Sequence, residues 1–157
     1  MKVNFINPVI QSTLEVLSTM AELEPKAETL RKKDPTIPIK GKHITGLMGM
    51  TGDNAYASIA LTFSEPVIIH IAQRMLPTNP TEINGTVIDL AGELANMVMG
   101  GAKTALEKEG YSFTLGLPTI IVGNEYLIAH RTKAPIVQVP FTMTEGTFYI
   151  EASYQSL

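Results

Sequence analysis

Helical and strand patterns fall into separate blocks along this 157-residue chain, and that grouping limits the folds open to it. One helical pattern comes first, two strand patterns follow, and two helical patterns and three strand patterns complete the order. Alternating strands and helices favour a parallel sheet, whereas segregated runs are typical of α+β folds. We therefore predict an α+β domain with three main helices packed on a mainly antiparallel sheet.

Local signals predict where the elements begin and end. The first helix is expected to start with Asn7 as its N-cap and Pro8 as its first residue, and to end near Glu24, before Pro25. Gly110 is expected to end the longest helix, which Gly100-Gly101 interrupts. Segment 25–40 is expected to be a solvated connector or edge segment. The other predicted elements are strands at 44–50, 56–63, 117–122, 136–143 and 147–154, and helices at about 64–76 and 83–109. The first two strands are expected to form a hairpin through the turn at 51–54, and the last two through the turn at 144–146.

Composition favours a single domain spanning 1–157, since hydrophobic residues make up 45% of the chain. Charged residues make up only 17%, below the typical ~25%, so part of the surface is expected to be covered, for example by a second copy of the chain. The absence of cysteine excludes disulfides, cysteine-based zinc sites and thiol nucleophiles, and it fits the cytoplasm.

Nucleic acid and membrane are both poor partners for this sequence. The net charge is −3 and the basic residues cluster only at 31–33, whereas duplex binding needs many phosphate contacts. The N-terminal residues have no long apolar region typical of a secretory signal, and no uncharged apolar stretch approaches ~18 residues. We expect a cytoplasmic protein without membrane insertion.

A polar stripe marks the longest helical pattern. Asp89, Glu93 and Asn96 stand at positions i, i+4 and i+7, which places them on one face, and Lys103 and Glu107 continue the stripe. A solvated face is the ordinary interpretation of such a stripe. However, asparagine is a poor mid-helix residue, and two like charges at i,i+4 repel one another. Stability alone would not select these residues, so they are our candidate functional residues.

The pattern Asp89-x-x-x-Glu93-x-x-Asn96 resembles the signature of the CheC/CheX/FliY phosphatases of bacterial chemotaxis. By chance the spacing would occur only about 0.03 times in such a chain. Segments 5–8 (Phe-Ile-Asn-Pro), 92–98 and 116–119 (Gly-Leu-Pro-Thr) extend the resemblance over nearly the whole chain. The first helix offers Glu15-x-x-Ser18 but lacks an asparagine, so the single signature is similar to the CheX branch.

The resemblance implies a CheC-like fold and a defined reaction. The substrate would be the aspartyl-phosphate of a response-regulator receiver domain of the phospho-CheY type. Asn96 would orient a water for in-line attack, Glu93 would pair with the receiver's active-site lysine, and Asp89 would make a supporting contact. No cofactor or metal of the chain's own is implied, because the receiver carries Mg²⁺. CheX proteins also form homodimers through sheet elements, so a homodimer is expected here.

Other interpretations of the sequence remain open. The chain could be a non-catalytic module that binds receivers or flagellar switch proteins, or a structural dimer with a solvated stripe. Gly92 and Gly100 suit either close approach of a partner or helix packing. The methionines at 48, 50, 97 and 99 are expected to fill gaps in the core, with a methionine-rich partner groove as the alternative.

The remaining patterns predict no other chemistry. His43, His70 and His130 are far apart and have no metal-ligand spacing, and His70 is expected to be structural. Gly46-x-x-Gly49 is not followed by the Gly-Lys-Ser/Thr of a phosphate loop, and no G-x-S-x-G occurs.

Overall fold

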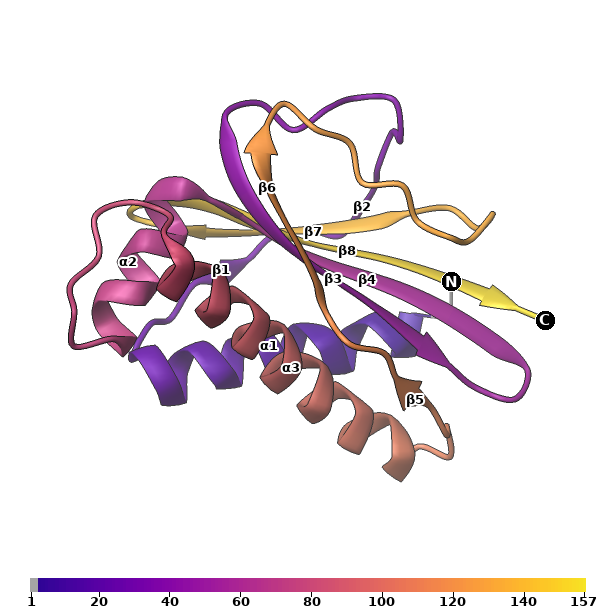
Figure 1. Cartoon of the computed structure of the whole chain (residues 1–157). Helices are drawn as coiled ribbons and strands as arrows, with labels where there is room; N and C mark the ends of the chain where they lie inside the picture. Colours follow the sequence, from indigo (N-terminus) through magenta and orange to yellow (C-terminus); the bar gives the residue numbers. More distant parts are fainter. Residues whose placement is uncertain (1–2) are drawn as a thin grey trace.

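An eight-stranded sheet and three helices form the two layers of the molecule, as a computed structural model describing residues 3–157 shows (Figure 1). Every strand pairing among these residues is antiparallel, so the predicted α+β class is confirmed. The elements are α1 (Val3–Ala21), β1 (Lys26–Ala27), β2 (Arg31–Lys32), β3 (Lys42–Thr51), β4 (Ala55–Ser64), α2 (Glu65–Met75), α3 (Gly85–Lys108), β5 (Thr114–Leu115), β6 (Thr119–Asn124), β7 (Val137–Met143) and β8 (Gly146–Ser156).

Two long hairpins build the centre of the sheet. The strand order is β1-β7-β8-β4-β3-β5, with β2 also paired to β7 and β6 also paired to β3. The predicted β3–β4 hairpin is confirmed, with His43 opposite Ser64. The β7–β8 hairpin closes with Met143 opposite Gly146, as the turn residues between them predict. The segment between α1 and β3 contributes β1 and β2 to the β7 edge, which confirms its assignment as an edge segment.

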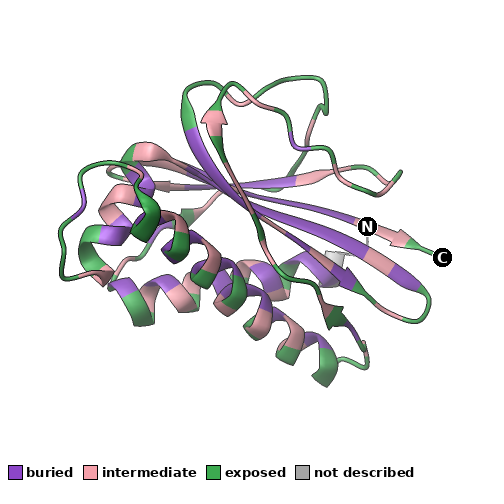
Figure 2. Ribbon diagram, in the orientation of Figure 1, coloured by how far each residue is buried: buried purple, intermediate pink, exposed green. Residues whose placement is uncertain are grey.

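Strand alternation builds the core between the layers. Ala57, Ile59, Leu61 and Phe63 of β4 belong to the same apolar cluster as the inner faces of the helices, as the period-two pattern predicts. Most of β4 is buried, as Figure 2 shows. Phe148 of β8 also belongs to this cluster, and its ring packs against those of Phe63 and Phe141. Burying large apolar side chains in this way supplies the main driving force for folding.

The other face of the sheet is covered by two irregular segments, 33–41 and 125–136, which lie on the side away from the helices (Figure 1). Tyr126 ties them together, since its hydroxyl bonds Thr45 Oγ1 at 2.6 Å and its carbonyl accepts the N–H of Ile39 at 3.1 Å. Burial raises the pKa of the Tyr126 phenol above its usual value.

A buried ionic network lies under these two segments. The carboxylate of Glu151 is fully buried and binds the ammonium of Lys33, His130 Nε2 at 3.1 Å and Gln138 Nε2 at 3.5 Å. Burial acts to raise the pKa of Glu151, but the hydrogen bonds from His130 and Lys33 outweigh it and hold this pKa below its usual value. Ser58 Oγ bonds His130 Nδ1 at 2.7 Å, yet Ser58 is 3% exposed within β4, so this serine–histidine–glutamate series is structural.

Two expectations about helix limits are wrong. α1 already includes Val3 rather than starting at Pro8, which lies inside the helix. Phe5 and Val9, on either side of the proline, are both buried, and their burial outweighs the one backbone hydrogen bond that the proline removes. The helix also ends at Ala21, before the expected limit, because Glu22 adopts a left-handed φ of 54° that terminates it.

The limits of α3 mostly follow the sequence. Asn84 caps the helix by accepting the N–H of Val87 at 3.0 Å, and Gly110 ends it with a φ of 93°. The expected interruption at Gly100-Gly101 is wrong, since α3 continues unbroken to Lys108. Across residues 3–157, no helix combines the length and the apolar character that crossing a bilayer requires.

Candidate functional site

The three residues of the polar stripe lie exposed on α3. Asp89, Glu93 and Asn96 make no side-chain hydrogen bond or ion pair within the described part of the chain. Helical geometry places the Cβ atoms of Glu93 and Asn96 about 5–6 Å apart. One carboxylate and one carboxamide therefore share an exposed face of α3, as their spacing predicted.

The buried face of α3 determines which way the stripe points. Val87, Leu90, Leu94 and Val98 are buried, and the small residues between them allow close packing on the sheet. Ala95 lies so near β3 that a Cβ added at Gly46 would be 3.0 Å from it. This close contact prevents the helix from rotating about its axis, so the stripe stays directed away from the core.

The glycines of α3 differ in how closely neighbouring elements pack against them. A Cβ at Gly92 would lie 3.8 Å from the side chain of Ile120 in β6, whereas Gly100 has nothing within 4 Å. Among the glycines of α3, the closest approach to another helix is at Gly101, where a Cβ would be 2.4 Å from Ser12 Oγ of α1. Ser12 Oγ donates to the carbonyl of Val98 at 2.6 Å, so a buried hydrogen bond joins the two helices next to the stripe.

A groove of about 410 Å³ runs between α1 and α3 beside Asn96. Asn96 and Glu15 border it, while neither Glu93 nor Asp89 does. Met97 also lines it, whereas Met48, Met50 and Met99 are buried in the core, as predicted. The sequence did not predict that α1 contributes to this surface, because the pairing of α1 with α3 is a tertiary contact. The residues that line the groove are Ser12, Glu15, Val16, Thr19, Met20, Asn96, Met97, Gly100 and Gly101.

The other polar groups near the stripe have partners or lie elsewhere. Lys103 pairs with Glu107 at 3.6 Å, whereas Glu93 makes no ion pair among the described residues. His70 lies near Glu145 at 3.7 Å, at the surface between α2 and the β7–β8 turn. Among the described side chains, no group of three or more potential ligands is placed to hold a metal ion.

The fold and the exposed stripe together define the class of protein. Three helices on an open antiparallel sheet form a CheC-like α+β fold, and a CheC-like superfamily protein from Shewanella sp. PV-4 is similar over 99% of this chain and 100% of its own, with 40% identity and a TM-score of 0.92. The family model described as chemotaxis phosphatase CheX matches residues 44–142. The chain therefore belongs to the CheX family.

Other solved structures agree with this assignment. The chemotaxis protein CheX from Vibrio vulnificus is 36% identical, with a TM-score of 0.90 over 98% of this chain and 100% of that one. A CheX–CheY–BeF₃–Mg²⁺ complex from Borrelia burgdorferi matches with 19% identity and a TM-score of 0.77 over 99% of this chain and 100% of that one, which shows a shared fold. No curated protein sequence is detectably similar to the chain.

Proposed function

We propose that this chain is a phosphatase that hydrolyses the aspartyl-phosphate of a CheY-type receiver domain and thereby ends a chemotaxis signal. The observation that carries the proposal is the exposed, unpartnered pair Glu93 and Asn96 on one face of α3, in a chain of the CheX family. The Borrelia relative, crystallised with CheY, BeF₃ and Mg²⁺, supports a receiver as the class of partner.

Asn96 acts on the attacking water. Its amide oxygen accepts a hydrogen bond from the water and its amide N–H groups donate, so the side chain orients the water without removing a proton. The water oxygen bonds to phosphorus while the bond from phosphorus to the aspartyl oxygen breaks. The aspartate leaves as a carboxylate, and the water proton stays with the inorganic phosphate. Positioning and electrostatics dominate such a transfer, because an acyl phosphate is already activated.

Glu93 and Asp89 serve docking. Glu93 pairs with the receiver's active-site lysine, which sets the register in which Asn96 reaches the phosphoryl group. Asp89, one turn earlier, makes a contact at the edge of the interface. Mg²⁺ arrives with the receiver and neutralises charge on the phosphoryl oxygens, so the chain itself supplies only side chains on a rigid helix.

The low helix propensity of asparagine supports a functional rather than a structural reason for Asn96 in α3. An exposed mid-helix asparagine costs about 0.5–0.7 kcal/mol relative to alanine, and this one recovers nothing through a side-chain partner. Asn96→Ala is therefore expected to stabilise the fold slightly while it removes the water-positioning group. Loss of activity together with a gain in stability separates a catalytic role from a structural one.

The test mixes the protein with a receiver domain phosphorylated by a small phosphodonor in Mg²⁺ and follows phosphate release. Asn96→Ala is expected to lower the rate by ~10²-fold with receiver binding retained, since misplacing a positioned group costs about that much. Glu93→Ala is expected to weaken binding of the receiver. Glu107→Ala, which removes a carboxylate further along the same stripe, is the matched control and keeps the wild-type rate.

Two outcomes would contradict the proposal. A wild-type rate for Asn96→Ala would remove its chemical basis. Formation of a complex with the receiver without faster loss of phosphate would instead identify a non-catalytic binding module.

We also propose that the chain forms a homodimer through a sheet edge. Among the described strands, β6 pairs only with β3, and Val122 on β6 is 40% exposed, so an apolar edge is available to a second copy. Light scattering of the purified chain is expected to give twice the monomer mass, and Val122→Lys to shift the mass toward the monomer. A monomer at all concentrations would contradict this.

A further inference from the structure

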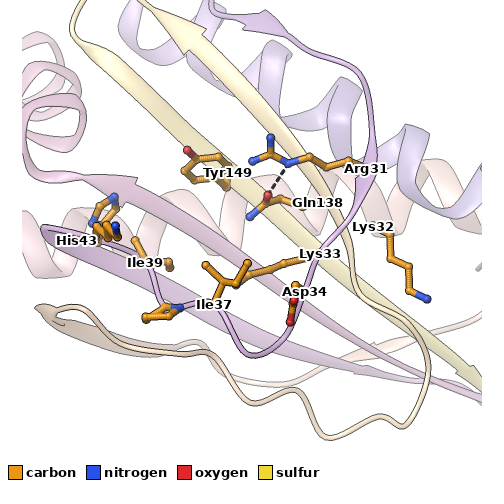
Figure 3. A pocket seen from close by; sticks show the side chains of 11 residues that line it. Arg31, Lys32, Lys33, Asp34, Ile37, Ile39, His43, Gln138 and Tyr149 are labelled. Atoms are coloured by element: carbon orange, nitrogen blue, oxygen red, sulfur yellow. Dashed lines mark hydrogen bonds between the residues drawn. The ribbon is translucent and has the colours of Figure 1, made fainter.

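We propose that a second pocket, on the face of the sheet away from α1 and α3, binds a small phosphorylated molecule of nucleotide size (Figure 3). This pocket is independent of the phosphatase proposal. Its volume is about 470 Å³, within the range usual for small-molecule sites. It is lined by Arg31, Lys32, Lys33, Asp34, Ile37, Pro38, Ile39, Lys40, His43, Gln138 and Tyr149.

Positive charge is concentrated in this pocket of an acidic protein. Its lining contains four cationic side chains and one carboxylate, whereas the whole chain has a net charge of −3. Lys33 is already neutralised by Glu151, and Lys32 points away from the other lining side chains in Figure 3. Arg31 and Lys40 make no ion pair within the described residues, so their charge is available to a ligand.

Arg31 is held in a geometry that suits a phosphoryl group. Its Nε donates to Gln138 Oε1 at 2.8 Å, and its guanidinium carbon lies 5.9 Å from the centre of the Tyr149 ring (Figure 3). These contacts restrict the side chain while leaving both terminal amino groups without a protein partner. Arginine with two free N–H groups binds phosphate in a bidentate manner, and fixing its geometry in advance lowers the entropy lost on binding.

The pocket also has an apolar wall, which a free inorganic ion does not need. Ile37 and Ile39 from the irregular segment face the Tyr149 ring across the pocket, with His43 at the end away from Arg31 (Figure 3). An apolar or aromatic body attached to the phosphate would contact these side chains. The lining therefore favours an organic phosphate, such as a nucleotide, over phosphate alone.

Backbone hydrogen bonds hold both ends of the segment that closes the pocket. The segment that closes it is anchored at one end by the N–H of Lys33, which donates to the carbonyl of Ile136 at 2.9 Å. At the other end the N–H of Ile39 donates to the carbonyl of Tyr126 at 3.1 Å. Gln138 is 7% exposed, so a buried amide supports the arginine from within the sheet.

The position of the pocket separates it from the phosphatase site. Gln138 and Tyr149 point to the sheet face opposite Val139 and Ile150, which pack into the core beneath the helices. A ligand here does not compete with a receiver docked on Asn96. The proposal consequently stands even if the phosphatase assay fails.

Isothermal titration of the full chain with ADP, pyrophosphate and adenosine tests the proposal at roughly 0.05 M and 0.5 M salt. ADP is expected to bind, pyrophosphate to bind more weakly because it lacks the apolar body, and adenosine not to bind. The higher salt concentration is expected to weaken ADP binding, since exposed charges are screened. The double variant Arg31→Ala/Lys40→Ala is expected to weaken ADP binding at least about 10-fold.

The matched control, Lys26→Ala/Lys108→Ala, removes two cations elsewhere on the surface and is expected to change ADP binding less than about 2-fold. Circular dichroism shows whether each variant is folded. Three results would overturn the proposal: no heat from ADP at millimolar concentration, wild-type affinity in the folded Arg31→Ala/Lys40→Ala variant, or an equal loss of affinity in the control.

Discussion

Replacing Gly101 with alanine tests how closely α1 and α3 pack beside the candidate site. The new Cβ would lie 2.4 Å from Ser12 Oγ and 3.4 Å from Ser12 Cβ. The first distance is too short for any real contact, so the hydroxyl must move. Ser12 is 7% exposed and its Oγ donates to the carbonyl of Val98 at 2.6 Å, so moving it breaks a buried hydrogen bond.

The magnitude follows from two opposing terms. A buried hydroxyl that loses its partner costs about 1–3 kcal/mol, whereas alanine gains about 1 kcal/mol over glycine inside a helix. Gly101→Ala is therefore expected to destabilise the protein by about 1 kcal/mol. In the Ser12→Ala background the hydroxyl is absent and the remaining contact of 3.4 Å is ordinary, so the same change is expected to stabilise by about 1 kcal/mol.

The assay is urea unfolding followed by circular dichroism, with the free energy of unfolding extrapolated to water. The double-mutant cycle of Ser12→Ala and Gly101→Ala is expected to give a coupling of about 2 kcal/mol. Gly100→Ala is the matched control, because nothing lies within 4 Å of its new Cβ, and it is expected to stabilise both backgrounds alike. If Gly101→Ala stabilises the wild-type chain as much as Gly100→Ala does, the close helix contact is refuted.

Three further predictions concern the buried network and the cap of α3. Lys33→Met leaves the buried carboxylate of Glu151 without its ammonium partner and is expected to cost about 3–5 kcal/mol in urea unfolding; a loss below 1 kcal/mol would contradict the burial of this pair. The pKa of Glu151 is lowered on folding from 4.5, so its ionised form stabilises the protein above that pH, and this stability is lost as pH falls through the folded pKa. Unfolding midpoints measured from pH 6 down to pH 3 are therefore expected to fall less in Glu151→Gln than in the wild type, and equal slopes would exclude Glu151 as the titrating group. Asn84→Ala removes the hydrogen bond to the Val87 N–H and is expected to cost about 1 kcal/mol, whereas Asn84→Asp is expected to retain most of the stability; equal stability of both variants with the wild type would show that the cap contributes nothing.

Local sequence patterns were sufficient to predict the helices and the two main hairpins. The alternation through Ile59 and Leu61 depends on a period of two residues, and the end of α3 at Gly110 depends on one residue's access to positive φ. Each of these signals is contained within a few neighbouring residues. Where a local signal competed with burial, as at Pro8 in α1, burial decided the outcome.

The candidate site also has one part that local sequence predicts and one part that depends on tertiary contacts. The sequence alone predicted that Glu93 and Asn96 lie on one face of a helix, because helical geometry determines their separation. The groove beside Asn96 could not be predicted from the sequence. It needs Val16 and Met20 from α1, and the position of α1 depends on the hydrogen bond from Ser12 to α3.

By itself, then, the amino-acid order determined the class of fold, the succession of its elements and the face of α3 on which the polar residues stand, since all three depend on interactions between near neighbours. Tertiary structure alone decided that Lys33 meets Glu151, 118 residues away, and that Arg31 and Tyr149 enclose a common pocket. Partners so distant in the chain are brought together only by the strand order of the sheet, and no periodicity in the sequence specifies that order.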